Sequence, residues 1–192
     1  MNKAVFLDRD GTLIEEVNYL KKKEEISLFP ETKKALLNLK ESGFLNIIIT
    51  NQSGIARGYF DENDLDSVHS ELRKILTDKG EELIDGIYYS PYHTEGIVDK
   101  FTKESNFRKP GTGMIDQAVK EHSLDIKESF LVGDSITDML CAKNAGLKKI
   151  LVKTGYGERD FDKCIEKNVI PEYYAGNIYD ASDYIINYKI LD

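Results

Sequence analysis

The stretch Ala4-Val-Phe-Leu-Asp-Arg-Asp-Gly-Thr12 decides the fold expected for this chain of 192 residues. Four apolar residues run without interruption into two aspartates and a glycine. Similar short apolar runs recur at Leu45–Ile49, Ile87–Tyr89, Ser129–Val132 and Lys149–Val152. Because these runs do not alternate apolar with polar side chains, they are typical of strands buried on both faces of a parallel sheet.

Segments with helical periodicity lie between the apolar runs. The apolar side chains of Glu62–Asp78 fall on one face, and Asp61 can cap the start of that helix. Further helices are expected at Glu31–Ser42, Thr112–Glu121, Ile136–Ala145 and Ile178–Tyr188. Strands that alternate with helices predict a doubly wound α/β fold with a mostly parallel sheet, in a single domain over residues 1–192. Residues 90–111 show neither pattern, and a loop of that length is usually functional.

Charge and composition exclude several classes of protein. The 26 basic and 34 acidic residues give a net charge of −8, which argues against a nucleic-acid-binding module. No apolar run approaches the ~18 residues of a membrane span, and Ala4–Leu7 is too short for the core of a signal peptide. Cys141 and Cys164 form no CxxC pair, so no disulfide framework is indicated. We expect a soluble, cytoplasmic protein.

Polar side chains follow three of the expected strands at the point where each strand ends. Asp8 and Asp10 follow the first strand, Thr50 the second, and Asp134 the fourth. Ligands of open α/β sheets bind outside the carboxyl ends of the strands, so we expect these side chains at one rim. Crowded carboxylates repel one another unless a cation lies among them, and Mg²⁺ binds through a few carboxylates plus substrate phosphate. Lys109 adds positive charge just before the next helix.

These residue types support phosphoryl transfer. Asp8 can attack phosphorus and form an aspartyl-phosphate. Asp10, two residues later, can protonate the leaving alkoxide and then deprotonate the attacking water. Mg²⁺, Lys109 and the Thr50 hydroxyl would stabilise the phosphoryl oxygens during transfer.

Each residue also has a simpler structural explanation. Asp8 and Asp10 could form a turn with Gly11, and Thr50 could be an ordinary strand residue. Ser135-x-x-Asp138 fits a helix capping box, which we favour over a direct metal role for Asp138. His69 lies at the border of an apolar helix face, and Cys141 is expected in the core. Chance does not readily place Asp8 and Asp10, Thr50, Arg108-Lys109 and Ser135-x-x-Asp138 in this order, each at the end of a strand or the start of a helix.

Four motifs resemble those of the haloacid dehalogenase (HAD) superfamily of phosphatases. They are Phe6-Leu-Asp-Arg-Asp-Gly-Thr-Leu13, Thr50-Asn-Gln-Ser-Gly-Ile55, Arg108-Lys-Pro110 and Gly133-Asp-Ser-Ile-Thr-Asp138. Thr50–Gly58, Asp85–Tyr89 and Arg108–Met114 further resemble the subfamily of heptose bisphosphate and histidinol-phosphate phosphatases. The resemblance extends from Val5 to about Gly155. It implies a capless enzyme, usually monomeric, that removes the 7-phosphate of D-glycero-D-manno-heptose 1,7-bisphosphate, a step in lipopolysaccharide precursor synthesis.

The resemblance also implies roles for individual residues. Asp8, the backbone carbonyl of Asp10, and Asp134 would bind Mg²⁺, while Thr50 and Lys109 would hold the transferred phosphoryl group. The implied substrate contacts are Glu16, Val17, Asn18, Tyr19, Asn51, Gln52, Ser53, Arg108 and Ser135, with Arg108 recognising the distal phosphate.

Two departures distinguish this chain from its relatives. Many relatives hold the long loop with zinc through Cys-Pro-His-His and Cys-x-Cys, whereas this chain has Ser90-Pro-Tyr-His93 and Ser105-Asn-Phe107. With Ser90, Tyr92, Ser105 and Phe107 at those positions, we expect no zinc. We expect Tyr92, Phe101 and Phe107 to hold the loop by packing. Ser135 stands where the heptose enzymes have a substrate-binding lysine.

The same residues are compatible with other functions. Histidinol phosphate is an alternative substrate of the same chemistry. A nucleic-acid 3′-phosphatase is disfavoured by the charge of −8 and the lack of a basic patch. A phospho-receiver signalling domain shares the α/β sheet and the Asp, Thr and Lys set, but its phosphoacceptor follows a middle strand. Continuous phosphate release would distinguish an enzyme from a receiver.

Overall fold

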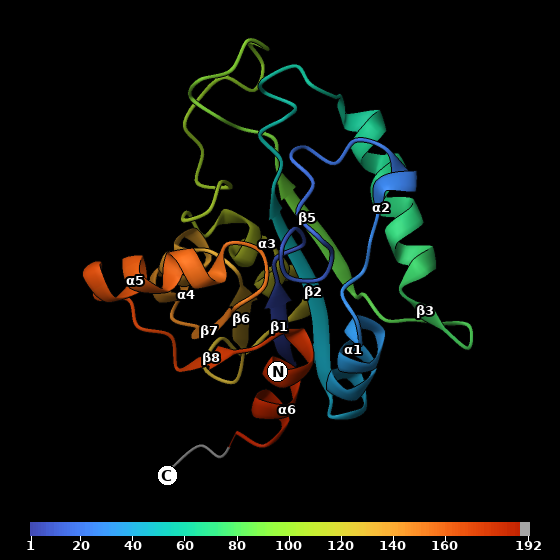
Figure 1. The fold of residues 1–192 in the computed structure, drawn as a ribbon, viewed down its shortest axis with the longest axis vertical. Helices are drawn as coiled ribbons and strands as arrows, with labels where there is room; N and C mark the ends of the chain where they lie inside the picture. The colour runs from blue at the N-terminus through green and yellow to red at the C-terminus, as the bar shows by residue number, and fades with distance from the viewer. Residues whose placement is uncertain (189–192) are drawn as a thin grey trace.

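A six-stranded sheet forms the centre of the computed structural model, which describes residues 1–188. The strand order is β5-β2-β1-β6-β7-β8, and every neighbouring pair is parallel (Figure 1). The strands are β1 (Lys3–Leu7), β2 (Phe44–Asn51), β5 (Gly86–Ser90), β6 (Phe130–Gly133), β7 (Lys148–Val152) and β8 (Tyr173–Ala175). The expected doubly wound α/β fold is confirmed.

Helices cover both faces of the sheet (Figure 1). The helices α1 (Thr32–Glu41), α2 (Glu62–Ile75) and α6 (Ile178–Ile186) contribute to the core on one face. The other face is covered by α3 (Gly113–His122), α4 (Ile136–Ala145) and α5 (Gly157–Glu166). A short 3₁₀ helix, η1, spans Lys23–Glu25.

Strand β1 shows why the sheet requires apolar residues without alternation. Val5 and Leu7 pack into the core with α1, α2 and α6, whereas Ala4 and Phe6 pack into the core with α3, α4 and α5. All four side chains are fully buried. Cys141, expected in the core, is also fully buried and unpaired.

Some boundaries differ from those expected. Helix α2 ends at Ile75 rather than continuing to Asp78, because Thr77–Asp78 (β3) pairs antiparallel with Glu81–Glu82 (β4). Gly80, with a φ of +86°, permits the tight connection between them. The sequence patterns predicted neither β8 nor α5. Asp61 caps α2 as expected, in a capping box with Asp64.

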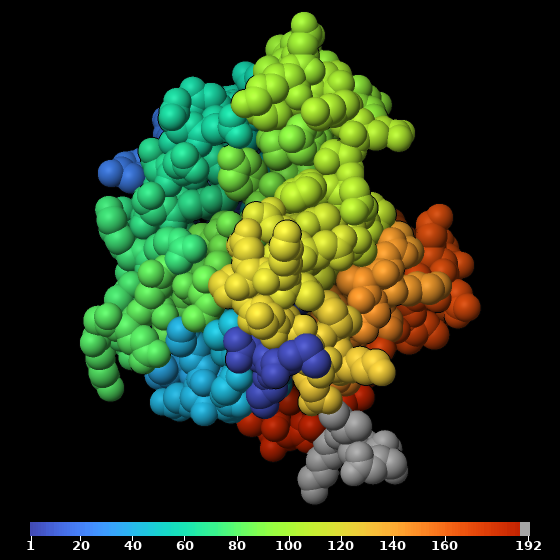
Figure 2. Space-filling view, turned by 180° about the vertical axis from the view of Figure 1, so that it is seen from behind, coloured from blue at the N-terminus to red at the C-terminus, as the bar shows by residue number. Residues whose placement is uncertain are grey.

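The long loop packs against the turn that follows β2. Tyr92 and Phe101 contact a small apolar cluster of Ile55, Phe60 and Leu65. The amides of Ile97 and Val98 both donate to the Ala56 carbonyl, at 2.8 and 3.0 Å. Figure 2 shows the loop, in yellow-green, as a lobe at the top of the molecule. Tyr92 and Phe101 therefore hold the loop as expected.

Phe107 differs from the other two aromatic residues of the loop. It is 37% exposed and lies outside this cluster, and its ring lies instead over the start of α3, where a Cβ at Gly113 would come 2.8 Å from Phe107 Cδ2. Across the part of the chain that the structure describes, no helix is both long and apolar enough to cross a membrane.

Candidate active site

The candidate site lies where the strand order reverses direction. From β1 the sheet continues through β2 to β5 on one side and through β6 to β8 on the other. Ligands of doubly wound folds bind at this position, outside the carboxyl ends of the strands. A pocket of about 370 Å³ lies there, and its wall includes Asp8 after β1, Thr50 on β2 and Asp134 after β6. The structure thus brings together the side chains expected at one rim.

Asp8 is held by a buried lysine. Lys109 Nζ donates to Asp8 Oδ1 at 2.7 Å and to Asp138 Oδ1 at 2.6 Å. Within residues 1–188, the other oxygen of Asp8 accepts no hydrogen bond. Burial raises the pKa of Asp8 to about 7 against the opposing charge of Lys109, with help from Asp138 and Asp10. Asp8 therefore needs additional positive charge to remain ionised in this pocket.

Lys109 is fixed through both its side chain and its backbone. Asn51 accepts from the Lys109 amide at 3.0 Å and donates to the Lys109 carbonyl at 3.1 Å. The ammonium group also donates to the Ile49 carbonyl at 3.0 Å. Burial alone would lower the pKa of Lys109, but the charges of Asp138 and Asp8 outweigh it and raise that pKa. Lys109 is therefore a fixed positive charge beside Asp8.

Asp134 occupies a site that two glycines leave open. A Cβ at Gly11 would lie 2.1 Å from Asp134 Oδ2, and one at Gly155 would lie 2.0 Å from the same atom. The amide of Tyr156 donates to that oxygen at 2.8 Å. Burial raises the pKa of Asp134 to about 8, with further contributions from the charges of Asp8 and Asp138.

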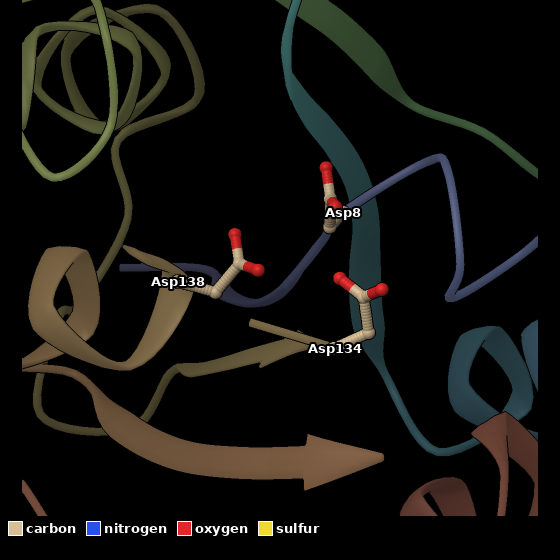
Figure 3. A group of neighbouring side chains, drawn as sticks. All are labelled: Asp8, Asp134 and Asp138. Atoms are coloured by element: carbon tan, nitrogen blue, oxygen red, sulfur yellow. The ribbon is translucent and has the colours of Figure 1, made fainter. Parts of the chain in front are cut away.

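Three carboxylates converge at this point. One oxygen each of Asp8, Asp134 and Asp138 lies within 4.8 Å of the other two (Figure 3). The oxygen donors of all three, and the raised pKa values of Asp8 and Asp134, suit a hard divalent cation such as Mg²⁺, which would favour the ionised forms. Asp138 also closes the expected capping box of α4, since its Oδ2 accepts from the Ser135 amide at 3.1 Å. The Asp138 side chain thus caps α4 with one oxygen and accepts a hydrogen bond from Lys109 with the other.

Asp10 is oriented by three neighbours. Arg9 Nη2 donates to Asp10 Oδ1 at 3.0 Å, and Gln52 Nε2 donates to Asp10 Oδ2 at 3.0 Å. The Thr50 hydroxyl lies 3.5 Å from the same Oδ2. These contacts hold the Asp10 carboxylate at the wall that it shares with Asp8.

Arg9 is itself held by His69. Arg9 is 1% exposed, and its Nη1 lies 3.2 Å from His69 Nε2. Burial, together with the charges of Arg9 and Arg73, lowers the pKa of His69 to about 3, so the imidazole is neutral. A neutral imidazole can accept the hydrogen bond from Arg9. His69 is 7% exposed, so it is buried in this contact rather than lying at the helix border as expected.

A second hollow of about 220 Å³ adjoins Asp10. Of the expected substrate contacts, six line it: Glu16, Asn18, Tyr19, Asn51, Gln52 and Ser53. Burial raises the pKa of Glu16, and the charge of Asp10 adds to that shift. Ser135 lines the first pocket.

Two of the expected substrate contacts lie elsewhere. Val17 packs against the core on the face of the sheet that α1, α2 and α6 cover, and it lines neither hollow. Arg108 lines a hollow beside the long loop that meets the first pocket at Lys109, and its Nη1 donates to the Tyr92 carbonyl at 3.3 Å.

Several residues of the pocket were not expected from the sequence. Tyr156, Arg159 and Lys163 line it from the segment that follows β7. Tyr156 follows β7 at its carboxyl end, and this place after a strand is the signal that could have indicated it. Nothing in the sequence pattern pairs Arg9 with His69, which lies 60 positions away.

Comparisons with known proteins agree with this geometry. A HAD-hydrolase-like family model matches residues 106–181. The chain is 45% identical over 156 residues to D-glycero-beta-D-manno-heptose-1,7-bisphosphate 7-phosphatase of Pasteurella multocida (strain Pm70), covering 81% of this chain and 84% of that protein. It is 35% identical over 185 residues to D-glycero-D-manno-heptose-1,7-bisphosphate 7-phosphatase of Thermosynechococcus vestitus, covering 95% and 94%.

A solved structure extends the agreement to the fold. The D,D-heptose 1,7-bisphosphate phosphatase from B. bronchiseptica, complexed with magnesium and phosphate, superposes with a TM-score of 0.81 at 27% identity. The match covers 96% of this chain and 98% of that one. The chain therefore belongs to the D-glycero-D-manno-heptose-1,7-bisphosphate 7-phosphatase family of the HAD superfamily, and it is a phosphatase.

Proposed function

We propose that this phosphatase removes the 7-phosphate of D-glycero-D-manno-heptose 1,7-bisphosphate in a Mg²⁺-dependent reaction through an aspartyl-phosphate. The observation that carries the proposal is Asp8, which lies 2.7 Å from Lys109 and faces Asp134 and Asp138. The names of the relatives and the magnesium and phosphate in the B. bronchiseptica structure support the choice of substrate and cation.

Asp8, Asp134 and the backbone carbonyl of Asp10 would hold the cation, with Asp138 close to them. Bound Mg²⁺ would neutralise the carboxylates and the phosphoryl oxygens, so that an anionic nucleophile can approach an anionic substrate.

Asp8 acts as the nucleophile in this proposal. Its Oδ2 attacks phosphorus, the bond from phosphorus to the sugar oxygen breaks, and the phosphoryl group is carried on Asp8. Lys109 and the Thr50 hydroxyl stabilise the oxygens of the phosphoryl group as its charge shifts. Because Lys109 is buried and fixed by Asn51, it needs no rearrangement during the step.

Asp10 transfers the protons. It gives a proton to the departing sugar oxygen, and the resulting carboxylate then takes one from the water that attacks the aspartyl-phosphate. Phosphate leaves, and Asp8 and Asp10 return to their initial states. Arg9, Gln52 and Thr50 keep the Asp10 carboxyl aimed at the pocket in both steps.

The test is phosphate release from both anomers of heptose 1,7-bisphosphate beside histidinol phosphate, with and without EDTA. Asp8→Asn should abolish turnover, and Asp10→Asn should lower kcat by about 10²–10⁴-fold. EDTA should stop the reaction and added Mg²⁺ should restore it. Turnover by Asp8→Asn would refute the mechanism. Faster turnover of histidinol phosphate than of either heptose 1,7-bisphosphate anomer would refute the proposed substrate.

A further inference from the structure

The catalytic pocket has two cationic side chains that the mechanism above does not use. Arg159 and Lys163 line the same pocket as Asp8 and Asp10. Both belong to α5 and lie four positions apart, so they project from one face of that helix. Helix α5 lies beside α4 at the outer edge of the molecule (Figure 1).

A buried carboxylate anchors both cations. Asp160 Oδ1 accepts from Arg159 Nε at 2.9 Å and from Lys163 Nζ at 2.6 Å. The other oxygen, Oδ2, accepts from the Ile136 amide at the start of α4, at 3.1 Å. Two positive charges thus share one negative charge, and this part of the wall keeps a net positive charge.

The charged groups remain open to the pocket. The side chains of Arg159 and Lys163 are 58% and 44% exposed, whereas that of Asp160 is 3% exposed. Arg159 lies over the ring of Tyr156, 4.2 Å from its centroid, and Tyr156 also lines the pocket. Asp160 engages the guanidinium only through Nε, so the two terminal nitrogens can form the paired hydrogen bonds that phosphate accepts.

The start of α4 adds to the positive wall. Ser135, Ile136 and Thr137 line the same pocket, at the end of the helix whose dipole favours anions. The remaining cation of this wall is Lys109, which Asp8 and Asp138 already engage and which is 4% exposed. Arg108 lines the adjoining hollow beside the long loop, which meets this pocket at Lys109. Within residues 1–188, the cations available to a second anionic group in this pocket are therefore Arg159 and Lys163.

We propose that Arg159 and Lys163 form the subsite for the second phosphate of a sugar bisphosphate, and that they set the preference of this enzyme for bisphosphates over monophosphates. The inference rests on the proposed function and assigns its distal-phosphate recognition to α5. Ser135 carries no charge of its own, so in this chain the cations come from the adjacent helix.

The test compares heptose 1,7-bisphosphate with heptose 7-phosphate, and fructose 1,6-bisphosphate with fructose 6-phosphate. The double variant Arg159→Met/Lys163→Met should raise KM for the preferred bisphosphate at least about tenfold, because it removes charge-assisted hydrogen bonds to phosphate. Its kcat/KM for the matching monophosphate should stay within about twofold, because that substrate does not reach the subsite.

Two controls accompany the double variant. Lys167→Met removes a positive charge from the end of the same helix but outside the pocket, and it should behave as wild type. Arg159→Lys/Lys163→Arg keeps both charges and should retain most of the preference. Recovery in this variant would distinguish phosphate binding from a general effect on the packing of α5.

The proposal is overturned if the methionine double variant keeps the wild-type preference, or if it loses activity equally on bisphosphates and monophosphates. It is also overturned if Arg108→Met alone removes the preference. The proposed function fails separately, when wild-type enzyme hydrolyses p-nitrophenyl phosphate but neither heptose phosphate. In that case the subsite is tested by comparing fructose 1,6-bisphosphate with fructose 6-phosphate as competitive inhibitors of p-nitrophenyl phosphate hydrolysis.

Discussion

Lys109 is the residue at which the charges of the site meet. Its ammonium group lies between Asp8 and Asp138 and donates to both, with a third bond to the Ile49 carbonyl. The two carboxylates are 13% and 0% exposed, so water screens this triad little. Removing Lys109 would leave two buried carboxylates without their counter-charge, which is strongly destabilising, whereas removing one carboxylate costs Lys109 a buried charge-assisted hydrogen bond.

Asp138→Asn therefore tests whether Asp138 acts on Lys109 or on the cation. The amide retains an oxygen for the Ser135 cap but removes the negative charge beside Lys109. We expect the free energy of unfolding to fall by about 2 kcal/mol, because the hydrogen bond between Lys109 and a charged carboxylate is lost while Lys109 stays paired with Asp8. We also expect kcat to fall while the half-saturating Mg²⁺ concentration stays unchanged. Urea unfolding and a Mg²⁺ titration of activity measure these quantities.

The cap can be examined separately. Ser135→Ala removes the hydroxyl of the capping box and should lower the free energy of unfolding by only about 1 kcal/mol. If Asp138→Asn instead raised the half-saturating Mg²⁺ concentration at unchanged kcat, Asp138 would be a direct metal ligand.

Among the elements, the connection from β7 to α5 has the strictest steric requirement. Gly155 has a φ of +58°, and a Cβ there would lie 2.0 Å from Asp134 Oδ2 and 2.7 Å from Gly11 Cα. The connection thus packs against the turn after β1, and Thr154 Oγ1 donates to the Gly11 carbonyl at 2.6 Å. Two loops distant in sequence fix the position of one carboxylate.

Gly155→Ala should displace Asp134 and weaken the binding of Mg²⁺. Since atoms this close must move apart, we expect the half-saturating Mg²⁺ concentration to rise about tenfold or more, the effect of disturbing a ligand's surroundings. Gly80→Ala is the matched control, because Gly80 also has a positive φ, +86°, but no atom within 4 Å of its Cβ position. An equal Mg²⁺ requirement in both variants would show that Gly155 serves the backbone alone.

The sequence patterns predicted the elements that carry long buried runs and missed those that do not. The five expected strands lie in the sheet, because each is apolar on both faces. Strand β8 has three residues with one fully buried, Ala175. Helix α5 has few apolar residues, and Cys164 is the one that is fully buried, so neither element carries enough apolar residues to stand out in the sequence. Burial in these elements depends on neighbours that the sequence does not reveal.

The same distinction applies to the site. Asp8, Asp10, Thr50 and Asp134 could be predicted because their place after a strand sets them at the rim. The contacts of Arg9 with His69 and of Lys109 with Asp138 depend on how helices pack onto the sheet. Such long-range pairs follow from the tertiary structure, and no local spacing encodes them.

For the whole molecule, the buried site couples stability to pH. His69 packs near Arg9, Arg73 and Tyr89, and its pKa falls from the ordinary 6.5 to about 3. The unfolded chain binds a proton at this imidazole below pH 6.5, whereas the folded chain does not until about pH 3. The contribution of His69 to stability is therefore complete above pH 6.5 and decreases as the pH falls toward 3.

Asp8 contributes with the opposite sign. Its pKa is raised to about 7, so its contribution is complete below the ordinary value of 3.8 and is lost as the pH rises through about 7. Both carboxylates with raised pKa values, Asp8 and Asp134, are present in wild type and in a His69 variant alike. A difference between the two proteins therefore isolates the imidazole.

His69→Gln should reduce the loss of stability in acid. Glutamine can accept a hydrogen bond from Arg9 but binds no proton in this range. One group that protonates only in the unfolded chain changes stability by about 1.4 kcal/mol per pH unit, so between pH 7 and pH 5 the wild type should lose about 2 kcal/mol more than the variant. Urea unfolding at the two pH values, with saturating Mg²⁺, measures this difference. Parallel pH profiles would show that the pKa of His69 in the folded protein is close to its ordinary value, and its contact with Arg9 would then need another explanation.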